Sequence, residues 1–162
     1  MSPPFRFPYS RPTPVTRDAD AEPSTGLTAG GVIDTSSRTS SEVRLVPAGA
    51  PETEPTVVRA RQDDLEYAID HWGDRFVVLT NLDAVDFRVM SAPLDAPGHW
   101  DDLVAHVEGR RISGVEAFAD HLVLHEWADA QQRLRIVHRD LSEQVLDLGA
   151  EDRAPLAQQA LQ

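Results

Sequence analysis

Residues 65–80 read LEYAIDHWGDRFVVLT, and residues 111–126, which lie 46 positions further on, read RISGVEAFADHLVLHE. Both segments pass from a strand-like stretch through an aromatic residue, a small residue and an aspartate into a second, strongly apolar stretch. The matched pairs are Ile69 with Val115, Asp70 with Glu116, Trp72 with Phe118, Gly73 with Ala119, Asp74 with Asp120, and Phe76 with Leu122. Self-similarity at one fixed spacing indicates a repeated structural unit.

The repeat continues downstream of these segments. Asp83-Ala84 matches Asp129-Ala130 at the same spacing and, with one inserted residue, Phe87–Val89 matches Leu134–Ile136. A unit of this length, with about four strands in it, is typical of the blades of a β-propeller. The repeat therefore favours a propeller over the other all-β architectures.

Two aromatic residues and two turns follow from this interpretation. A single four-stranded sheet cannot bury both of its faces, so blades must stack on one another. We expect Trp72 and Phe118 to supply large apolar area at the contacts between blades. Gly73-Asp74 and Ala119-Asp120 are expected to turn the chain between the first and second strands of each unit.

Short strands separated by turns account for most of the chain. Residues 75–80 are apolar at alternate and at consecutive positions, which suits a strand buried on both faces. The expected strands are Glu42–Val46, Thr56–Arg59, Leu65–His71, Arg75–Thr80, Phe87–Met90, Trp100–Val107, Arg111–Phe118, His121–Trp127, Arg133–Arg139 and Gln144–Leu148. The predicted fold class is all-β, with about two four-stranded β-propeller blades plus one extra strand and a disordered N-terminal tail.

Three regions follow from composition. Residues 1–38 are rich in Pro, Ser and Thr with few apolar side chains, and this composition predicts a disordered tail. Residues 39–149 form the predicted partial β-propeller. Residues 150–162 hold Pro155 and a short Ala/Gln/Leu stretch, and we expect a C-terminal tail there with one or two helical turns or a frayed end.

Composition also excludes several classes of protein. The formal net charge of -12 argues against binding to the phosphate backbone of nucleic acids, which requires a basic face. The chain has no cysteine, which excludes disulfides, thiolate nucleophiles and thiolate-bound zinc. No apolar run approaches the roughly 20 residues that span a bilayer, and the N-terminus lacks the apolar core of a secretory signal. We therefore expect a cytoplasmic protein without nucleic-acid or membrane partners.

Several runs resemble the propeller of the prolyl oligopeptidase family, above all its oligopeptidase B-like members. The stretch from Leu65 to Phe76 is similar to a family segment with Glu-Tyr, His, Gly and Phe at fixed places, and the resemblance covers roughly residues 39–148. Further matching runs are Thr39–Arg44, Leu79–Asn81, Phe87–Val89, Gly114–Phe118 and Leu122–Leu124. The structural motif residues that carry the resemblance are Tyr67, Trp72, Gly73, Asp74, Phe76, Phe118, Asp120 and Leu122.

The resemblance implies a segment of a two-domain serine-type endopeptidase. In that family a seven-bladed propeller caps an α/β-hydrolase domain and limits substrates to short peptides, and oligopeptidase B-like members cleave after Arg or Lys. The partners implied are the missing propeller blades, the α/β-hydrolase domain of the parent enzyme, and short basic peptides. A truncated or frame-altered version of a longer chain would explain why residues 1–38 and 150–162 do not resemble the family.

The catalytic apparatus of that family has no counterpart in these 162 residues. No G-x-S-x-G nucleophile elbow occurs, and neither Ser91 nor Ser113 has glycines at the required spacing. We therefore assign no catalytic, cofactor-binding or metal-binding residue and expect the chain to be inactive on its own.

Two other interpretations remain at this stage. The first is a stand-alone protein-binding module that uses propeller blades as a scaffold. The second is a metal-dependent enzyme that uses His121 and His125, which are four residues apart as in helical zinc sites. The segment reads as a strand, however, and residues four apart on a strand are separated by about 13 Å, too far to share one ion.

Overall fold

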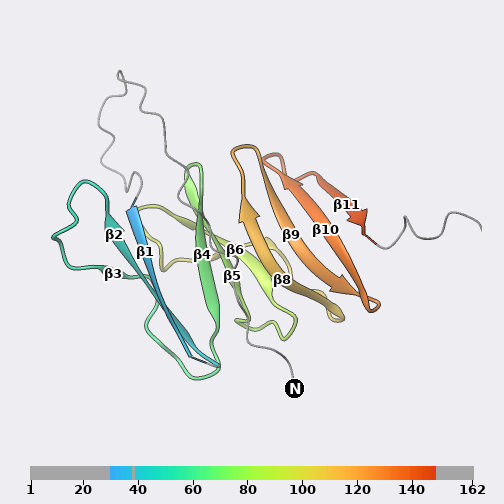
Figure 1. Cartoon of the computed structure of the whole chain (residues 1–162), viewed down its shortest axis with the longest axis horizontal. Helices are drawn as coiled ribbons and strands as arrows, with labels where there is room; N and C mark the ends of the chain where they lie inside the picture. The colour runs from blue at the N-terminus through green and yellow to red at the C-terminus, as the bar shows by residue number, and fades with distance from the viewer. Residues whose placement is uncertain (1–29, 38, 149–162) are drawn as a thin grey trace, which may run out of the picture.

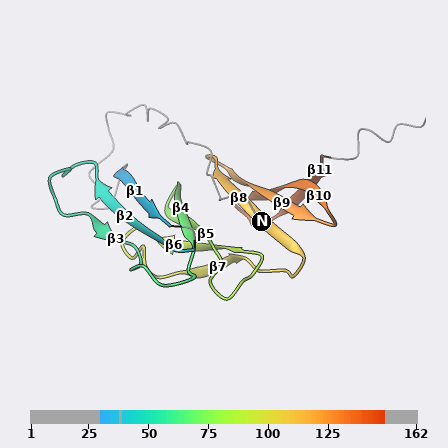
Figure 2. The same ribbon diagram turned by 60° about the horizontal axis from the view of Figure 1, so that its bottom comes forward.

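The computed structural model describes residues 30–37 and 39–148, and these residues form three antiparallel sheets that lie side by side (Figures 1 and 2). The described residues contain no helix, and so none that is long and apolar enough to cross a membrane. The strands are β1 (Gly30–Ser36), β2 (Ser41–Pro47), β3 (Thr56–Val57), β4 (Tyr67–Trp72), β5 (Arg75–Thr80), β6 (Arg88–Pro93), β7 (Asp101–Val104), β8 (Arg110–Ala117), β9 (His121–Ala128), β10 (Gln131–His138) and β11 (Glu143–Asp147).

Two of the sheets have four strands each and follow the chain order. The strand order is β4-β5-β6-β7 in the central sheet and β8-β9-β10-β11 in the last sheet. The all-β class and the two four-stranded blades are confirmed. The extra strand of the prediction is instead a three-stranded sheet with the order β1-β2-β3.

Strand β1 corrects the predicted tail, because it lies inside residues 1–38. Its backbone pairs with β2 over its whole length, from Gly30 opposite Pro47 to Ser36 opposite Ser41. The side chains of residues 31–36 are exposed, so the strand is held by main-chain hydrogen bonds and leaves no apolar alternation in the sequence. The remaining tail predictions, for residues 1–29 and 150–162, lie outside the described residues.

The central sheet is buried on both faces. Val77, Leu79 and Val89 belong to a core shared with the last sheet, whereas Phe76 and Val78 belong to a core shared with the first sheet. Neighbouring residues of β5 point to opposite faces, so this strand contributes to both cores at once. The prediction that residues 75–80 form a strand buried on both sides is confirmed.

The repeat is visible in the strand pairing. Trp72 pairs with Arg75 across the β4–β5 hairpin, and at the same place in β8–β9 the Phe118 amide donates to the carbonyl of His121. Asp83 and Asp129, which the repeat also matches, both have positive φ angles, of 50° and 53°. The spacing of 46 residues therefore describes the first two strands of each blade.

The third strand departs from the predicted match by two residues. Val89 lies opposite Leu79 in the central sheet, and the equivalent of Leu79, His125, lies opposite Leu134. Val89 thus corresponds to Leu134 and not to Ile136. Both candidates point to the same face because side chains alternate with a period of two, which is why the sequence pattern did not distinguish them.

Strand ends differ from the predicted ones where a turn or a side chain stops the pairing. Strand β6 begins after Phe87, whose φ of 68° is incompatible with a strand, and it continues to Pro93. Strand β3 has only two residues, and β7 begins after Trp100, whose indole donates to the carbonyl of Pro97.

We predict that Ala130→Gly stabilises the protein. Asp129 and Ala130 form the two-residue turn between β9 and β10, and both have positive φ angles, of 53° and 60°. A side chain at such an angle costs about 1 kcal/mol, which glycine removes. The free energy of unfolding in urea should therefore rise by about 0.5–1 kcal/mol. Ala50→Gly, in a turn without positive φ, is the control, and an equal effect of the two changes would contradict the prediction.

Candidate functional site

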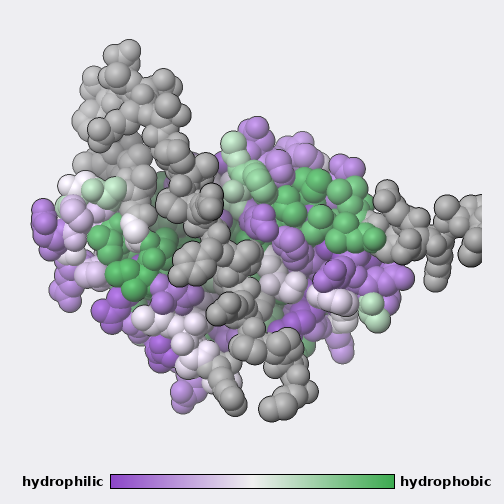
Figure 3. Space-filling view, in the orientation of Figure 1, coloured by the Kyte–Doolittle hydropathy of each residue, from purple (hydrophilic) through white to green (hydrophobic). Residues whose placement is uncertain are grey.

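The last sheet has one covered face and one open face. Along β9, Leu122, Leu124 and Glu126 point toward the central sheet and are buried, whereas Val123 and Trp127 point away from it. Trp127 is 45% exposed, and Figure 3 shows apolar side chains gathered over the region of β9–β11. No sheet of the described chain covers this outer face.

Arg139 ties the rims of the last two sheets together. It lies in the connection between β10 and β11, and its guanidinium sits 4.3 Å from the ring centroid of Trp72, which is only 2% exposed. The same group donates to the Asp74 carboxylate at 3.3 Å and to the carbonyl of Ala119 at 3.1 and 3.2 Å. One side chain therefore contacts the β4–β5 hairpin and the β8–β9 hairpin together.

Gly73 lies beneath this arginine. Its φ is 64°, and a Cβ atom built on it would overlap the guanidinium of Arg139, which would have to move. Asp74, beside it, also binds Arg75, and the hydrogen bond from Arg75 lowers the pKa of Asp74 below its usual value. The Gly73-Asp74 pair thus turns the chain, as predicted, and also provides the seat for Arg139.

Tyr67 anchors three segments on the other side of the central sheet. Its buried hydroxyl donates to the carbonyl of Arg59 at 2.6 Å and accepts from the amides of Val43 and Arg59 at 2.9 and 3.2 Å. Burial raises the pKa of Tyr67, so the phenol stays protonated and can donate. The Tyr67 ring packs against Trp100 with centroids 5.0 Å apart. The Arg59 guanidinium lies over the Trp100 ring, 4.3 Å from its centroid.

The first strands of the two blades carry acidic groups near one another. Asp70 of β4 accepts from the His71 amide at 2.8 Å and, across the sheets, from the Ala117 amide of β8 at 3.4 Å. Burial raises the pKa of Asp70, and the nearby Glu116 raises it further. Glu116 itself is 3.0 Å from the Nε2 atom of His125.

A buried ion cluster crosses the last sheet. Glu126 is 1% exposed and accepts two hydrogen bonds from Arg135, at 2.8 and 3.2 Å, while Arg110 lies 3.7 Å away. The hydrogen bond to Glu126 raises the pKa of Arg135, which also binds Glu143. The position equivalent to Glu126 in the central sheet is Thr80, so the cluster belongs to one copy of the repeat.

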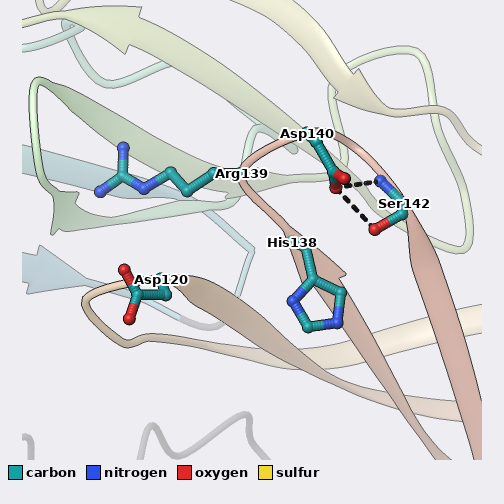
Figure 4. A pocket seen from close by; sticks show the side chains of 5 residues that line it. All are labelled: Asp120, His138, Arg139, Asp140 and Ser142. Carbon is teal, nitrogen blue, oxygen red and sulfur yellow. Dashed lines mark hydrogen bonds between the residues drawn. The ribbon is translucent and has the colours of Figure 1, made fainter.

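One shallow hollow lies at the rim beside Arg139. It is lined by Asp120, His138, Arg139, Asp140 and Ser142 (Figure 4). Asp140 accepts from the hydroxyl and the amide of Ser142, which lowers the pKa of Asp140. The hollow is open to solvent, and within the described part of the chain the Ser142 hydroxyl is bonded to the Asp140 carboxylate and not to the His138 imidazole.

His121 and His125 share the outer face of β9 but have different partners. His121 stacks on Phe118 with centroids 5.0 Å apart, while His125 binds Glu116. Within residues 30–37 and 39–148, no group of three His, Asp or Glu side chains is placed to hold a metal ion.

Seven of the eight motif residues fall into two groups. Tyr67, Trp72, Phe76 and Leu122 are buried in the two cores, and Gly73, Asp74 and Asp120 lie in exposed turns. Trp72 lies in the core between the two blades, as expected, whereas Phe118 is 47% exposed on the outer face of the last sheet, so its contact with a further blade stays a prediction. The aromatic residue before each of the two turns faces the sheet that follows in the chain, and the described residues form no sheet beyond Phe118.

Arg139 and Glu126 could not be predicted from the sequence. An arginine in an exposed turn does not signal a contact between sheets, and a glutamate in a strand does not signal burial.

A sequence model of the prolyl oligopeptidase N-terminal β-propeller domain matches residues 31–157. The chain belongs to this family. The match begins within β1, in agreement with the corrected boundary. Dipeptidyl aminopeptidase BI of Pseudoxanthomonas mexicana is 40% identical over 111 residues, which are 67% of this chain and 15% of the relative. Protease 2 of Moraxella lacunata is 26% identical over 106 residues, 65% of this chain and 15% of the relative.

Solved structures of oligopeptidase B support the same assignment. The Trypanosoma brucei enzyme with covalently bound antipain superposes with a TM-score of 0.64 at 27% identity, covering 72% of this chain and 18% of that chain. The Leishmania major enzyme gives a TM-score of 0.66 at 22% identity over the same shares and bears on the fold alone. This chain thus spans less than a fifth of the length of each of these relatives.

We predict that Gly73→Ala and Arg139→Ala are coupled. Gly73→Ala should cost about 1–2 kcal/mol through its positive φ and should also displace the guanidinium of Arg139. The second cost disappears in an Arg139→Ala background, so urea unfolding of the two single variants and the double variant should show less than additive losses.

The control for this comparison of single and double variants is Gly109→Ala. Gly109 also has a positive φ, of 78°, but a Cβ atom there would meet nothing within 4 Å. Its cost should be the same with and without Arg139. Equal costs of Gly73→Ala in the two backgrounds would show that Arg139 does not rest on the glycine.

We predict that the effect of Asp70→Asn depends on pH. Because the folded pKa of Asp70 is raised, its stabilising contribution is complete below the unfolded value of about 3.9 and is lost as the pH rises through the folded pKa. The unfolding free energy of Asp70→Asn relative to the wild type should therefore increase from pH 3 to pH 7. Exposed Asp63→Asn is the control, and a difference that does not change with pH would refute the prediction.

Proposed function

We propose that this chain forms a non-catalytic part of the propeller that caps the hydrolase domain of an oligopeptidase B-like serine peptidase. The outer face of β8–β11 carries the proposal. Phe118 and Trp127 are 47% and 45% exposed there, and Leu146 of β11 is also exposed. The opposite face of the same sheet is covered by the central blade, so another blade is the natural cover for this one.

The partners in this proposal are the remaining blades and the α/β-hydrolase domain. Family membership and the likeness to oligopeptidase B support this assignment. The two relatives are named as a dipeptidyl aminopeptidase and a protease, which supports peptide hydrolysis by the complete enzyme. The chain contributes no group to the hydrolytic step.

The contribution of the chain to gating comes from the first strands of its blades. These strands surround the central channel of a propeller. Strands β4 and β8 are joined across the blades by the bond from the Ala117 amide to Asp70. Strands held together in this way keep the channel narrow, so that extended peptides pass and folded proteins do not.

A preference for basic peptides belongs to the same proposal. Asp70 and Glu116 place carboxyl groups on the channel strands, and the net charge of the chain is -12. A negative field around a narrow entrance raises the local concentration of cationic peptides. Substrates cleaved after Arg or Lys fit this field.

Grafting tests the proposal. Residues 31–148 would replace the matched segment in dipeptidyl aminopeptidase BI of Pseudoxanthomonas mexicana, and kcat/KM would be measured on a fluorogenic substrate of that enzyme. We expect the graft to keep kcat/KM within about tenfold, equal to 1.4 kcal/mol, because the segment contributes no group to the hydrolytic step.

The isolated chain is the control in this experiment. It should not hydrolyse an Arg-containing fluorogenic peptide. Turnover by the chain alone that a serine-reactive inhibitor abolishes would overturn the proposal. A graft that fails to fold, or that folds without activity, would equally count against it.

A further inference from the structure

The β8–β9 hairpin repeats the β4–β5 hairpin at its rim. Phe118 occupies the place of Trp72, the last residue before the turn, and Asp120 occupies the place of Asp74 within it. Each rim therefore combines an aromatic ring with a carboxylate two residues further on. A flat cation is the ligand that both groups attract, one through its π face and the other through its charge.

In the first copy this site is filled. The Arg139 guanidinium lies 4.3 Å from the Trp72 ring centroid and 3.3 Å from an Asp74 carboxylate oxygen. It comes from the β10–β11 connection of the following sheet, so the contact is part of the packing between sheets. The filled copy thus shows that the site binds a guanidinium and that the arginine belongs to the following sheet.

In the second copy the site is open. Phe118 is 47% exposed, and His121 stacks on one face of its ring with an interplanar angle of 12°. The exposed Asp120 carboxylate makes no hydrogen bond or ion pair within the described part of the chain. Figure 4 shows the Arg139 side chain on the same rim, but its hydrogen bonds go to Ala119 and Asp74.

We propose that Phe118 and Asp120 form a receptor for the guanidinium of an arginine on the sheet that packs against the outer face of β8–β11. This inference rests on the proposed function, which places another blade there. Arginine is favoured over lysine because a planar guanidinium can stack on a ring and bind a carboxylate at once, as Arg139 does. This arginine adds a specific polar contact to the apolar packing between the outer face of the last sheet and the sheet that covers it.

The test is a titration of the isotope-labelled full chain, followed by NMR of its amides. N-acetyl-arginine amide is the probe, and N-acetyl-lysine amide is the comparison. We expect the amides of residues 118–121 to shift on millimolar arginine amide, with weaker shifts on lysine amide. Phe118→Ala and Asp120→Asn should each weaken arginine binding by about two- to fivefold.

Asp95→Asn is the matched control, since Asp95 is exposed in the β6–β7 connection and the change removes the same charge. Arginine shifts that are equal in Asp95→Asn and Asp120→Asn would overturn the receptor, as would equal responses to arginine and lysine. Shifts of residues 118–121 with protein concentration alone would show that a second copy occupies the outer face, which also overturns the receptor.

A second test uses the grafted enzyme. There, the losses of unfolding free energy caused by Phe118→Ala and Asp120→Asn should be less than additive, and additive losses would contradict a shared ligand. An active graft with no arginine response leaves the proposed function standing and removes only the receptor.

Discussion

Burial of both faces of a thin sheet is the constraint on which this structure depends. A four-stranded sheet is one layer of backbone, and a strand such as β5 is apolar at consecutive positions, with Phe76 and Val77 pointing to opposite cores. Such a strand is stable only between two other layers. The order of the three sheets, the positions of the two cores and the open face at the last sheet all follow from this requirement.

The repeated hairpins and the most apolar strand could be predicted from the sequence. The match of Trp72 with Phe118 located both hairpins, and the pattern at residues 75–80 located the most buried strand. Strand β1 was missed because its exposed side chains carry no periodic signal. Arg139 was missed because its contact partners, Trp72 and Ala119, lie 67 and 20 residues away in the sequence, and only the folded arrangement brings them together.

Glu126 illustrates a different limit of sequence reasoning. A glutamate in a strand is ordinarily assigned to the solvent face, yet this one is fully buried and held by Arg135. Removing two charges from water is costly unless each is paired and hydrogen-bonded, and here the carboxylate has two arginines around it. Neither position alone indicates the pair; the strand register of β9 and β10 creates it.

Among the described residues, the main contacts between sheets join neighbouring sheets, through β2 with β4 on one side and β4 and β5 with β8 on the other. Each sheet is also built from consecutive strands. Pairing consecutive strands closes shorter loops of the chain than packing one sheet on another, so it costs less conformational entropy. The chain can therefore fold in the order in which it is synthesised: the strands of a sheet pair once they have left the ribosome, and the sheet becomes stable when the next one packs on its open face.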